Sequence, residues 1–177
     1  MIGLVFLTIF SSLSKSPPNA CQQLAPALLK HIRRTLPQYE VARTADFEKS
    51  WLSNRAPKEQ TDGTPWCISG DFDGNGQTDV VLLLNHKGTI TVMGFRAVAD
   101  SYVHSLAFSR TDTLYRSPLQ LALFRTPPGR ILGGGFGDEP ITDVKNKNPA
   151  VSLEFFETSS VYLYWANGRW HEVWTSD

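Results

Sequence analysis

The sequence has little of what redox, zinc and nucleic-acid sites are built from. Its 177 residues include two cysteines and four histidines, and 17 basic residues balance 17 acidic residues. A net charge of zero gives no electrostatic case for binding nucleic acid or an anionic membrane surface. The two cysteines have neither the CxxC nor the clustered spacing of redox and zinc sites. These classes of function are therefore disfavoured from the start.

Signatures of catalysis are missing as well. The sequence contains no H-E-x-x-H, G-x-S-x-G or Cys-His constellation. The four histidines fall in separate predicted elements: His31, His86, His104 and His171. The segment Gly133–Gly137 lacks both the G-x-G-x-x-G spacing and the Lys-Ser/Thr pair of a phosphate-binding loop. We therefore predict no enzyme and no catalytic residues, with one alternative: a hydrolase that uses Glu139 and Asp143 as an acid and base pair.

No apolar run in the sequence reaches the roughly 20 residues that a membrane-spanning helix needs. The N-terminal run Ile2–Phe10 has about the length of a signal-peptide core, and small residues precede Lys15. We predict a signal peptide at residues 1–14, a single domain at residues 15–177 and a periplasmic or secreted bacterial protein without integral membrane association. Ala20-Cys21 suggests lipid anchoring as an alternative, but the apolar run lies too far upstream, so we favour simple release.

The two cysteines agree with export. In an oxidising compartment Cys21 and Cys67 could form one disulfide that joins the N-terminal helix to the acidic loop that begins at Asp71. Such a bridge would stabilise the fold by about 4 kcal/mol in the chain-entropy model. The alternative is two unrelated buried thiols.

The richest motif is a loop of alternating oxygen ligands. Asp71, Asp73, Asn75 and Asp79 occupy loop positions 1, 3, 5 and 9, with glycines between them, and Gln77 at position 7 offers a backbone carbonyl. Ca²⁺ takes six to eight oxygens, and crowded carboxylates repel one another unless a cation lies between them. We predict a Ca²⁺ site formed by these five residues. The alternative is a set of hydrogen-bonded turns that precede a strand.

The sequence after the loop excludes an EF-hand. Position 12 is Leu82 rather than Glu, inside the apolar run Val80–Leu84 that predicts a buried strand. The stretch GDFDGNGQTDVVLLL resembles the calcium loop D-x-D-G-x-G-x-x-D of FG-GAP or VCBS repeats, which belong to extracellular β-propellers. That resemblance implies bound calcium with a structural role. A complete propeller needs about four or more blades, so the chain is too short to form one.

Apolar spacing predicts helices first and strands afterwards. Leucines and Ile32 repeat at helical intervals over 24–36, and a second helix is expected from Thr44 with Phe47, Trp51 and Leu52 on one face. Strands are expected from Trp66 onward. We therefore predict an α+β fold in which N-terminal helices pack on a mainly antiparallel β-sheet or meander.

The strand pattern divides at a glycine-rich segment. Residues 79–85, 89–96, 102–108 and 119–125 are expected to form a continuous antiparallel meander, and Arg130–Asn148 a loop excursion. The stretches VSLEFFE, SVYLYWA and RWHEVWTS should close the chain as strands. Asn167-Gly168 predicts a type I′ hairpin between the last two.

That hairpin sorts aromatic side chains onto two faces. One face is expected to carry Val161, Leu163, Trp165, Trp170 and Trp174, and the other Tyr162, Tyr164 and His171. Core packing on both sides is the favoured interpretation, and an exposed aromatic strip that binds a ligand or partner is the alternative.

A second resemblance concerns most of the chain. The succession of a leucine-rich helix, DFDGNGQTD with VVLLL, LALFRTPPG and FFETSSVYLYWANGRWHEVWTSD looks like a family of small exported bacterial proteins of unknown function. It implies one compact domain and says nothing of activity. We predict a calcium-binding recognition module that contacts a protein or an envelope glycan. An inhibitor or immunity-type protein that blocks a cell-wall enzyme is a further alternative.

Overall fold

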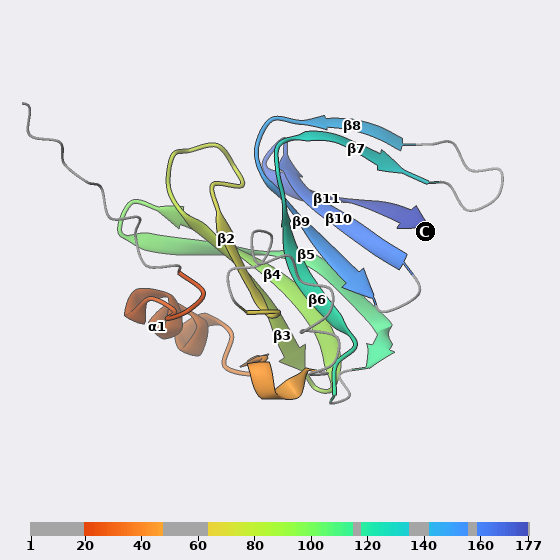
Figure 1. The fold of residues 1–177 in the computed structure, drawn as a ribbon. Helices are drawn as coiled ribbons and strands as arrows, with labels where there is room; N and C mark the ends of the chain where they lie inside the picture. The colour runs from red at the N-terminus through yellow and green to blue at the C-terminus, as the bar shows by residue number, and fades with distance from the viewer. Residues whose placement is uncertain (1–19, 48–63, 115–117, 135–141, 156–158, 177) are drawn as a thin grey trace, which may run out of the picture.

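The apolar run Val80–Leu84 lies at the centre of the structure, in a strand buried on both faces. The computed structural model describes residues 20–47, 64–114, 118–134, 142–155 and 159–176 (Figure 1). Strand β3, Asp79–His86, pairs antiparallel with three other strands of a five-stranded sheet. The five strands are β1 (Glu40–Val41), β2 (Cys67–Gly70), β3, β4 (Thr89–Val98) and β5 (Ser101–Leu114). The prediction of a buried strand after the loop is confirmed.

A second sheet of four antiparallel strands covers one face of the first. Its order is β11-β10-β9-β6. The strands are β6 (Leu121–Thr126), β9 (Ala150–Phe155), β10 (Ser159–Ala166) and β11 (Arg169–Ser176). A separate two-stranded ribbon is formed by β7 (Gly129–Gly133) and β8 (Thr142–Asn146). Figure 1 shows the two sheets as layers, with helix α1 (Pro26–Thr35) on the far side of the first sheet.

The two faces of β3 belong to two different cores. Val81 and Leu83 face the second sheet and join a large cluster between the layers. Val80, Leu82 and Leu84 face the other way and pack against helix α1, Pro26–Thr35. Because successive strand residues point to opposite sides, a continuous apolar run is what a strand between two layers requires.

The predicted α+β class is wrong. The described residues form eleven strands and a single α-helix, mostly in antiparallel sheets. The expected second helix is a short 3-10 turn at Thr44–Asp46, after which Phe47 is extended and bridges Leu119. Trp51 and Leu52 lie outside the described residues. Phe47 is buried in the core between the sheets, and this packing outweighs the helical spacing of the local sequence.

The predicted meander ends at β5. Strand β6 does not pair with β5 but lies in the second sheet beside β9. If β6 paired with β5, it would only widen the first sheet. Because the chain crosses to the second sheet after β5, Leu121 and Leu123 of β6 pack against the first sheet in the core between the two layers. The glycine-rich segment Arg130–Asn148 was also expected to be a loop, and its described ends instead contribute to β7 and β8.

The expected hairpins are present. Asn167 and Gly168 have φ values of 51° and 78°, the positive values that a type I′ turn needs, and they connect β10 to β11. Lys87 and Gly88, with φ values of 53° and 79°, connect β3 to β4 in the same way.

The aromatic faces of the last hairpin are covered rather than displayed. The core between the sheets contains or contacts the predicted inner set of Val161, Leu163, Trp165, Trp170 and Trp174. On the opposite face, Tyr162 and Tyr164 pack near Ile131 and Val144 of the small ribbon. His171 stacks on Tyr164. Core packing is therefore the observed role of this hairpin.

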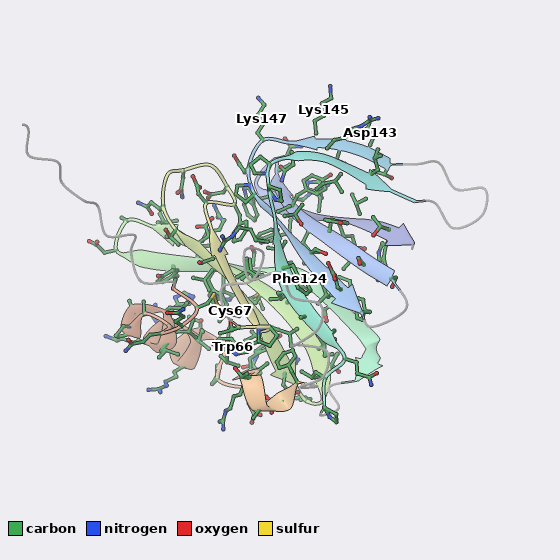
Figure 2. All side chains as sticks on the ribbon, viewed as in Figure 1. Trp66, Cys67, Phe124, Asp143, Lys145 and Lys147 are labelled. Carbon is green, nitrogen blue, oxygen red and sulfur yellow. A yellow bond between two sulfur atoms is a disulfide. The ribbon has the colours of Figure 1, made fainter. Side chains whose placement is uncertain are left out.

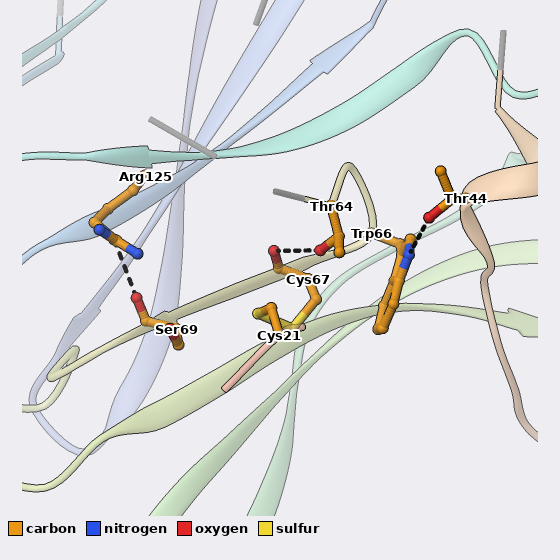
Figure 3. The surroundings of a disulfide bond; sticks show 7 residues. All are labelled: Cys21, Thr44, Thr64, Trp66, Cys67, Ser69 and Arg125. Atoms are coloured by element: carbon orange, nitrogen blue, oxygen red, sulfur yellow. Dashed lines mark hydrogen bonds between the residues drawn. A yellow bond between two sulfur atoms is a disulfide. The ribbon is translucent and has the colours of Figure 1, made fainter. Parts of the chain in front are cut away.

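The predicted disulfide is present. Cys21 and Cys67 are bonded, with 5.5 Å between their Cα atoms, and both are fully buried beside β2 (Figure 3). The bridge fixes the segment before α1 to the first sheet. No helix among the described residues combines the length and apolar character that crossing a membrane requires.

Gly94 on β4 makes room for a tryptophan from the second sheet. A Cβ atom at this position would lie 2.4 Å from Nε1 of Trp170 and 2.7 Å from two of its ring carbons. We expect Gly94→Ala to lower the free energy of unfolding by about 1–3 kcal/mol, because the indole must move. Urea denaturation measures this cost. It should shrink in a Trp170→Leu background, and an undiminished cost there would show that the clash is not the cause.

Candidate metal centre

The acidic loop is the connection between two paired strands. Gly70, at the end of β2, lies opposite Asp79, at the start of β3. The loop between them therefore begins and ends at the same point of the sheet. The pairing of β2 with β3 fixes both ends of the loop. The disulfide at Cys67 holds β2 itself in place.

Three carboxylates of this loop converge. Asp71, Asp73 and Asp79 each offer a carboxylate oxygen, and these three oxygens lie within 4.8 Å of one another. An arrangement of this kind could hold a metal ion. Because the three ligands come from one short loop and the strand after it, the spacing in the sequence alone is enough to bring them together.

Asp71 organises the turn. Its Oδ1 accepts hydrogen bonds from the backbone N–H groups of Gly74 (2.8 Å) and Asn75 (3.0 Å), and its Oδ2 accepts one from Gly76 (2.9 Å). Gly74 and Gly76 have φ values of 78° and 81°, which glycine adopts at little cost. The loop thus curls around Asp71 because glycines stand where the backbone turns back.

Asp79 is the buried member of the cluster. Its side chain is fully shielded from solvent, and it accepts hydrogen bonds from the backbone N–H groups of Phe72 (3.1 Å) and Ala97 (2.8 Å). Burial raises the pKa of Asp79 to about 6, and the charge of Asp73 adds to this rise, while the backbone hydrogen bonds oppose it. A positive charge at the cluster would favour the ionised form.

Asp73 already has a positive partner. Nη1 of Arg96 lies 3.0 Å from Oδ2 of Asp73, and both side chains are largely buried. The guanidinium of Arg96 also covers the ring of Trp165, at 4.2 Å from the centroid. One arginine therefore joins the loop to an aromatic side chain of the second sheet.

Asn75 and Gln77 complete the turn in the structure. Asn75 Oδ1 accepts a hydrogen bond from the Gln77 N–H at 2.7 Å, and Asn75 Nδ2 donates to the carbonyl of Ala97 at 3.0 Å. Asn75 Nδ2 also lies 3.3 Å from Oδ2 of Asp73. The role of these two residues as metal ligands stays a prediction, whereas the convergence of the three aspartates is observed.

Sequence reasoning missed Arg96 and Asn148. Arg96 had a usable signal: counting back from the Lys87-Gly88 turn pairs Val80 with Phe95, which places the next residue, Arg96, beside Asp79. Asn148 donates from Nδ2 to the carbonyl of Phe72 at 3.2 Å. Nothing local indicates this contact, because it depends on how the second sheet returns to the loop.

The carboxylates of the hydrolase alternative have a different environment. Asp143 on β8 makes a two-pronged pair with Arg130, with Nε–Oδ1 and Nη2–Oδ2 distances of 2.7 Å and 2.8 Å. The hydrogen bond from Arg130 lowers the pKa of Asp143, which disfavours it as a proton donor near neutral pH. Figure 2 shows Asp143 at the outer rim of the molecule. Glu139 lies outside the described residues.

No family model, curated protein or solved structure matches the chain. The resemblance of the loop to FG-GAP or VCBS repeats, and that of the chain to a family of small exported proteins, therefore stay predictions.

Removal of Arg96 should be costly in the metal-free protein. With a chelator present, we expect Arg96→Met to lower the free energy of unfolding by about 1–3 kcal/mol, because Asp73 loses its counter-charge and Trp165 loses a stacked cation. Chemical denaturation measures the change. Arg130→Met is the matched control: its ion pair with Asp143 is exposed and screened by solvent, so its loss should cost clearly less than the loss of Arg96. Equal costs for the two variants would contradict the assigned role of Arg96.

Proposed function

We propose that the loop Asp71–Asp79 binds one Ca²⁺ ion and that the protein is an exported recognition module held in its binding shape by that ion. The observation that carries the proposal is the convergence of three carboxylates within 4.8 Å at the base of a strand pair. The donors are all oxygens, which suits a hard cation such as Ca²⁺ better than Zn²⁺ or Cu²⁺. The carbonyl of Gln77, the amide oxygen of Asn75 and water would supply the remaining ligands.

The contacts around the loop support a structural role for the ion. Asp79 accepts from the N–H of Ala97, and Asn75 donates to the carbonyl of the same residue. The loop is therefore tied to β4 just before the β4–β5 hairpin. An ion that orders the carboxylates would also fix the position of this hairpin.

An apolar surface beside the loop supports recognition of a protein partner. Val98 and Val103 on the β4–β5 hairpin are 44% and 45% exposed. Val98 follows Ala97, and Val103 lies opposite Arg96 in the strand pair, so both are next to the loop. Exposed apolar side chains that lie together are candidates for an interaction surface, and we assign this role to the two valines beside the acidic loop. Binding at this hairpin would depend on the ion that holds it in place.

Export is part of the same proposal. The Cys21–Cys67 disulfide fits an oxidising compartment, and the predicted signal peptide would deliver the chain to the periplasm or the medium. Extracellular calcium sites work at dissociation constants on the order of 10⁻⁴ to 10⁻³ M, so a loop with a few ligands and a competing arginine suits this setting.

Thermal unfolding tests the ion. With about 10 mM Ca²⁺ in place of chelator, we expect the melting temperature to rise by roughly 3–10 °C, the range that these dissociation constants give for a chain of this size. Mg²⁺ should have a smaller effect because it gives up its water reluctantly. Asp73→Ala should abolish the response, and Asp143→Ala, which removes an exposed acid elsewhere, should retain it. Identical melting curves with Ca²⁺ and chelator would refute the proposed site.

Capture from an envelope extract tests recognition. The immobilised protein should retain a partner in Ca²⁺ and release it in chelator, and the double variant Val98→Ser and Val103→Ser should retain much less. Leu132→Ser is the matched control, because Leu132 is slightly more exposed, at 51%, but lies on the small β7–β8 ribbon. Loss of capture in the control as well would remove the evidence for a surface at the hairpin.

A further inference from the structure

Two histidines meet where α1 packs on the first sheet. His31 lies on α1 and His104 on β5, and His31 Nε2 is 2.9 Å from His104 Nδ1. Both rings contact Phe95 of β4, each with its centroid 6.2 Å from that of the phenyl ring. The pair therefore lies at the edge of the core that holds the helix against the sheet.

The geometry is that of a hydrogen bond rather than a metal site. The ring centroids of His31 and His104 are 5.2 Å apart, so the two facing nitrogens lie close to the line that joins the ring centres. The N–H of one ring points at the lone pair of the other, and no ion fits between the two nitrogens. In the described parts of the chain, neither histidine belongs to a group of three metal-ligating side chains. One proton must lie between the two nitrogens.

The hydrogen bond between His31 and His104 can form only while at least one of the two facing nitrogens lacks a proton. A neutral pair has one N–H donor and one acceptor at the contact, and one added proton leaves that arrangement intact. When both imidazoles are cationic, two N–H groups face each other at hydrogen-bond distance, and the contact must open.

The surroundings of the pair add more positive than negative charge. From α1, Lys30 and Arg34 line a cavity of about 240 Å³ beside His31, and from β5 and the turn before it Tyr102 and Asp100 line the other side. The neighbouring Phe95 carries no charge. Desolvation lowers the pKa of His31 most, followed by the charges of His104 and Arg34. The cavity gives water access to the ring once the contact opens.

We propose that the His31–His104 hydrogen bond is an acid-sensitive latch: when both rings become charged, α1 loosens from the first sheet while the Cys21–Cys67 disulfide keeps its N-terminal end attached. The loosened helix would uncover apolar side chains of β3 and β4, among them Leu82, Met93 and Phe95. The bridge makes this change reversible. The inference does not rest on the proposed calcium site: His104 lies opposite Phe95 and Phe95 opposite Val80, which places the pair at the Asp79 end of β3 but on the face that packs against α1.

The direction of the pH effect follows from linkage. Because His31 binds its proton less readily in the folded protein than in the unfolded chain, the unfolded chain takes up protons first as the pH falls. The contribution of this group to stability is fully present above the ordinary pKa of histidine, about 6.5, and is lost as the pH falls below it. The helix should therefore loosen on acidification and tighten again on neutralisation.

Amide hydrogen exchange of the full chain tests the latch. Exchange rates of α1 amides, converted to protection factors to remove the intrinsic pH effect, are compared at about pH 7.5 and about pH 5. We expect protection in α1 to fall at least about fivefold at the lower pH, the factor equivalent to one lost hydrogen bond. His104→Gln should keep an acceptor for His31 without taking up a proton, so its α1 protection should change little with pH.

A histidine outside the pair serves as the control. His171→Gln changes a histidine of the second sheet, which is stacked on Tyr164, and should behave like the wild type. Should His104→Gln not fold, the reciprocal His31→Gln variant and NMR titration of the unmodified imidazoles take its place. The His31 imidazole is expected to take up its proton over the pH range in which α1 protection falls. Constant α1 protection in the wild type, protonation of His31 outside that pH range, or a pH response that persists without either histidine would overturn the latch.

Discussion

Burial of the Asp79 carboxylate is the constraint on which the acidic loop depends. The side chain has no access to solvent, and its two oxygens accept from Phe72 at the start of the loop and from Ala97 on the neighbouring strand. A buried carboxylate must be hydrogen-bonded, neutralised by a proton or matched by a positive charge. Here the hydrogen bonds are satisfied by backbone, Arg96 reaches the neighbouring Asp73, and the pKa of Asp79 still rises to about 6. The site is thus short of positive charge, which is the physical basis for assigning it a cation.

The same strand that begins at Asp79 also carries the layered architecture. Val80, Leu82 and Leu84 contact the helix side, and Val81 and Leu83 contact the second sheet, so β3 connects both cores to the loop. A shift of one residue in its register would exchange the two faces. The pairing of Gly70 with Asp79 and the Lys87-Gly88 turn fix that register at the two ends of the strand. The register of β3 therefore sets the position of Asp79 in the acidic loop and of the apolar side chains in both cores.

Local signals predicted local features well. The alternating acids, the Asn167-Gly168 turn and the apolar run after the loop each act over a few residues, and the structure contains the corresponding cluster, hairpin and buried strand. The α+β class was wrong because helical spacing after Thr44 could not reveal that Phe47 is buried beside Leu119. The crossing of β6 to the second sheet and the strands within Arg130–Asn148 depend on long-range pairing. Arg96 was within reach of a register argument, but its contact with Trp165 was not.

Isothermal titration calorimetry with Ca²⁺, in buffers that differ in ionisation enthalpy, counts the bound ions and the released protons in one experiment. With a carboxyl whose pKa is about 6 inside the site, binding should release a large fraction of one proton per ion at about pH 5.5 and almost none at about pH 8. We expect one ion to bind per chain with this proton release. Absence of binding heat at millimolar Ca²⁺, or the same proton release at both pH values, would contradict it.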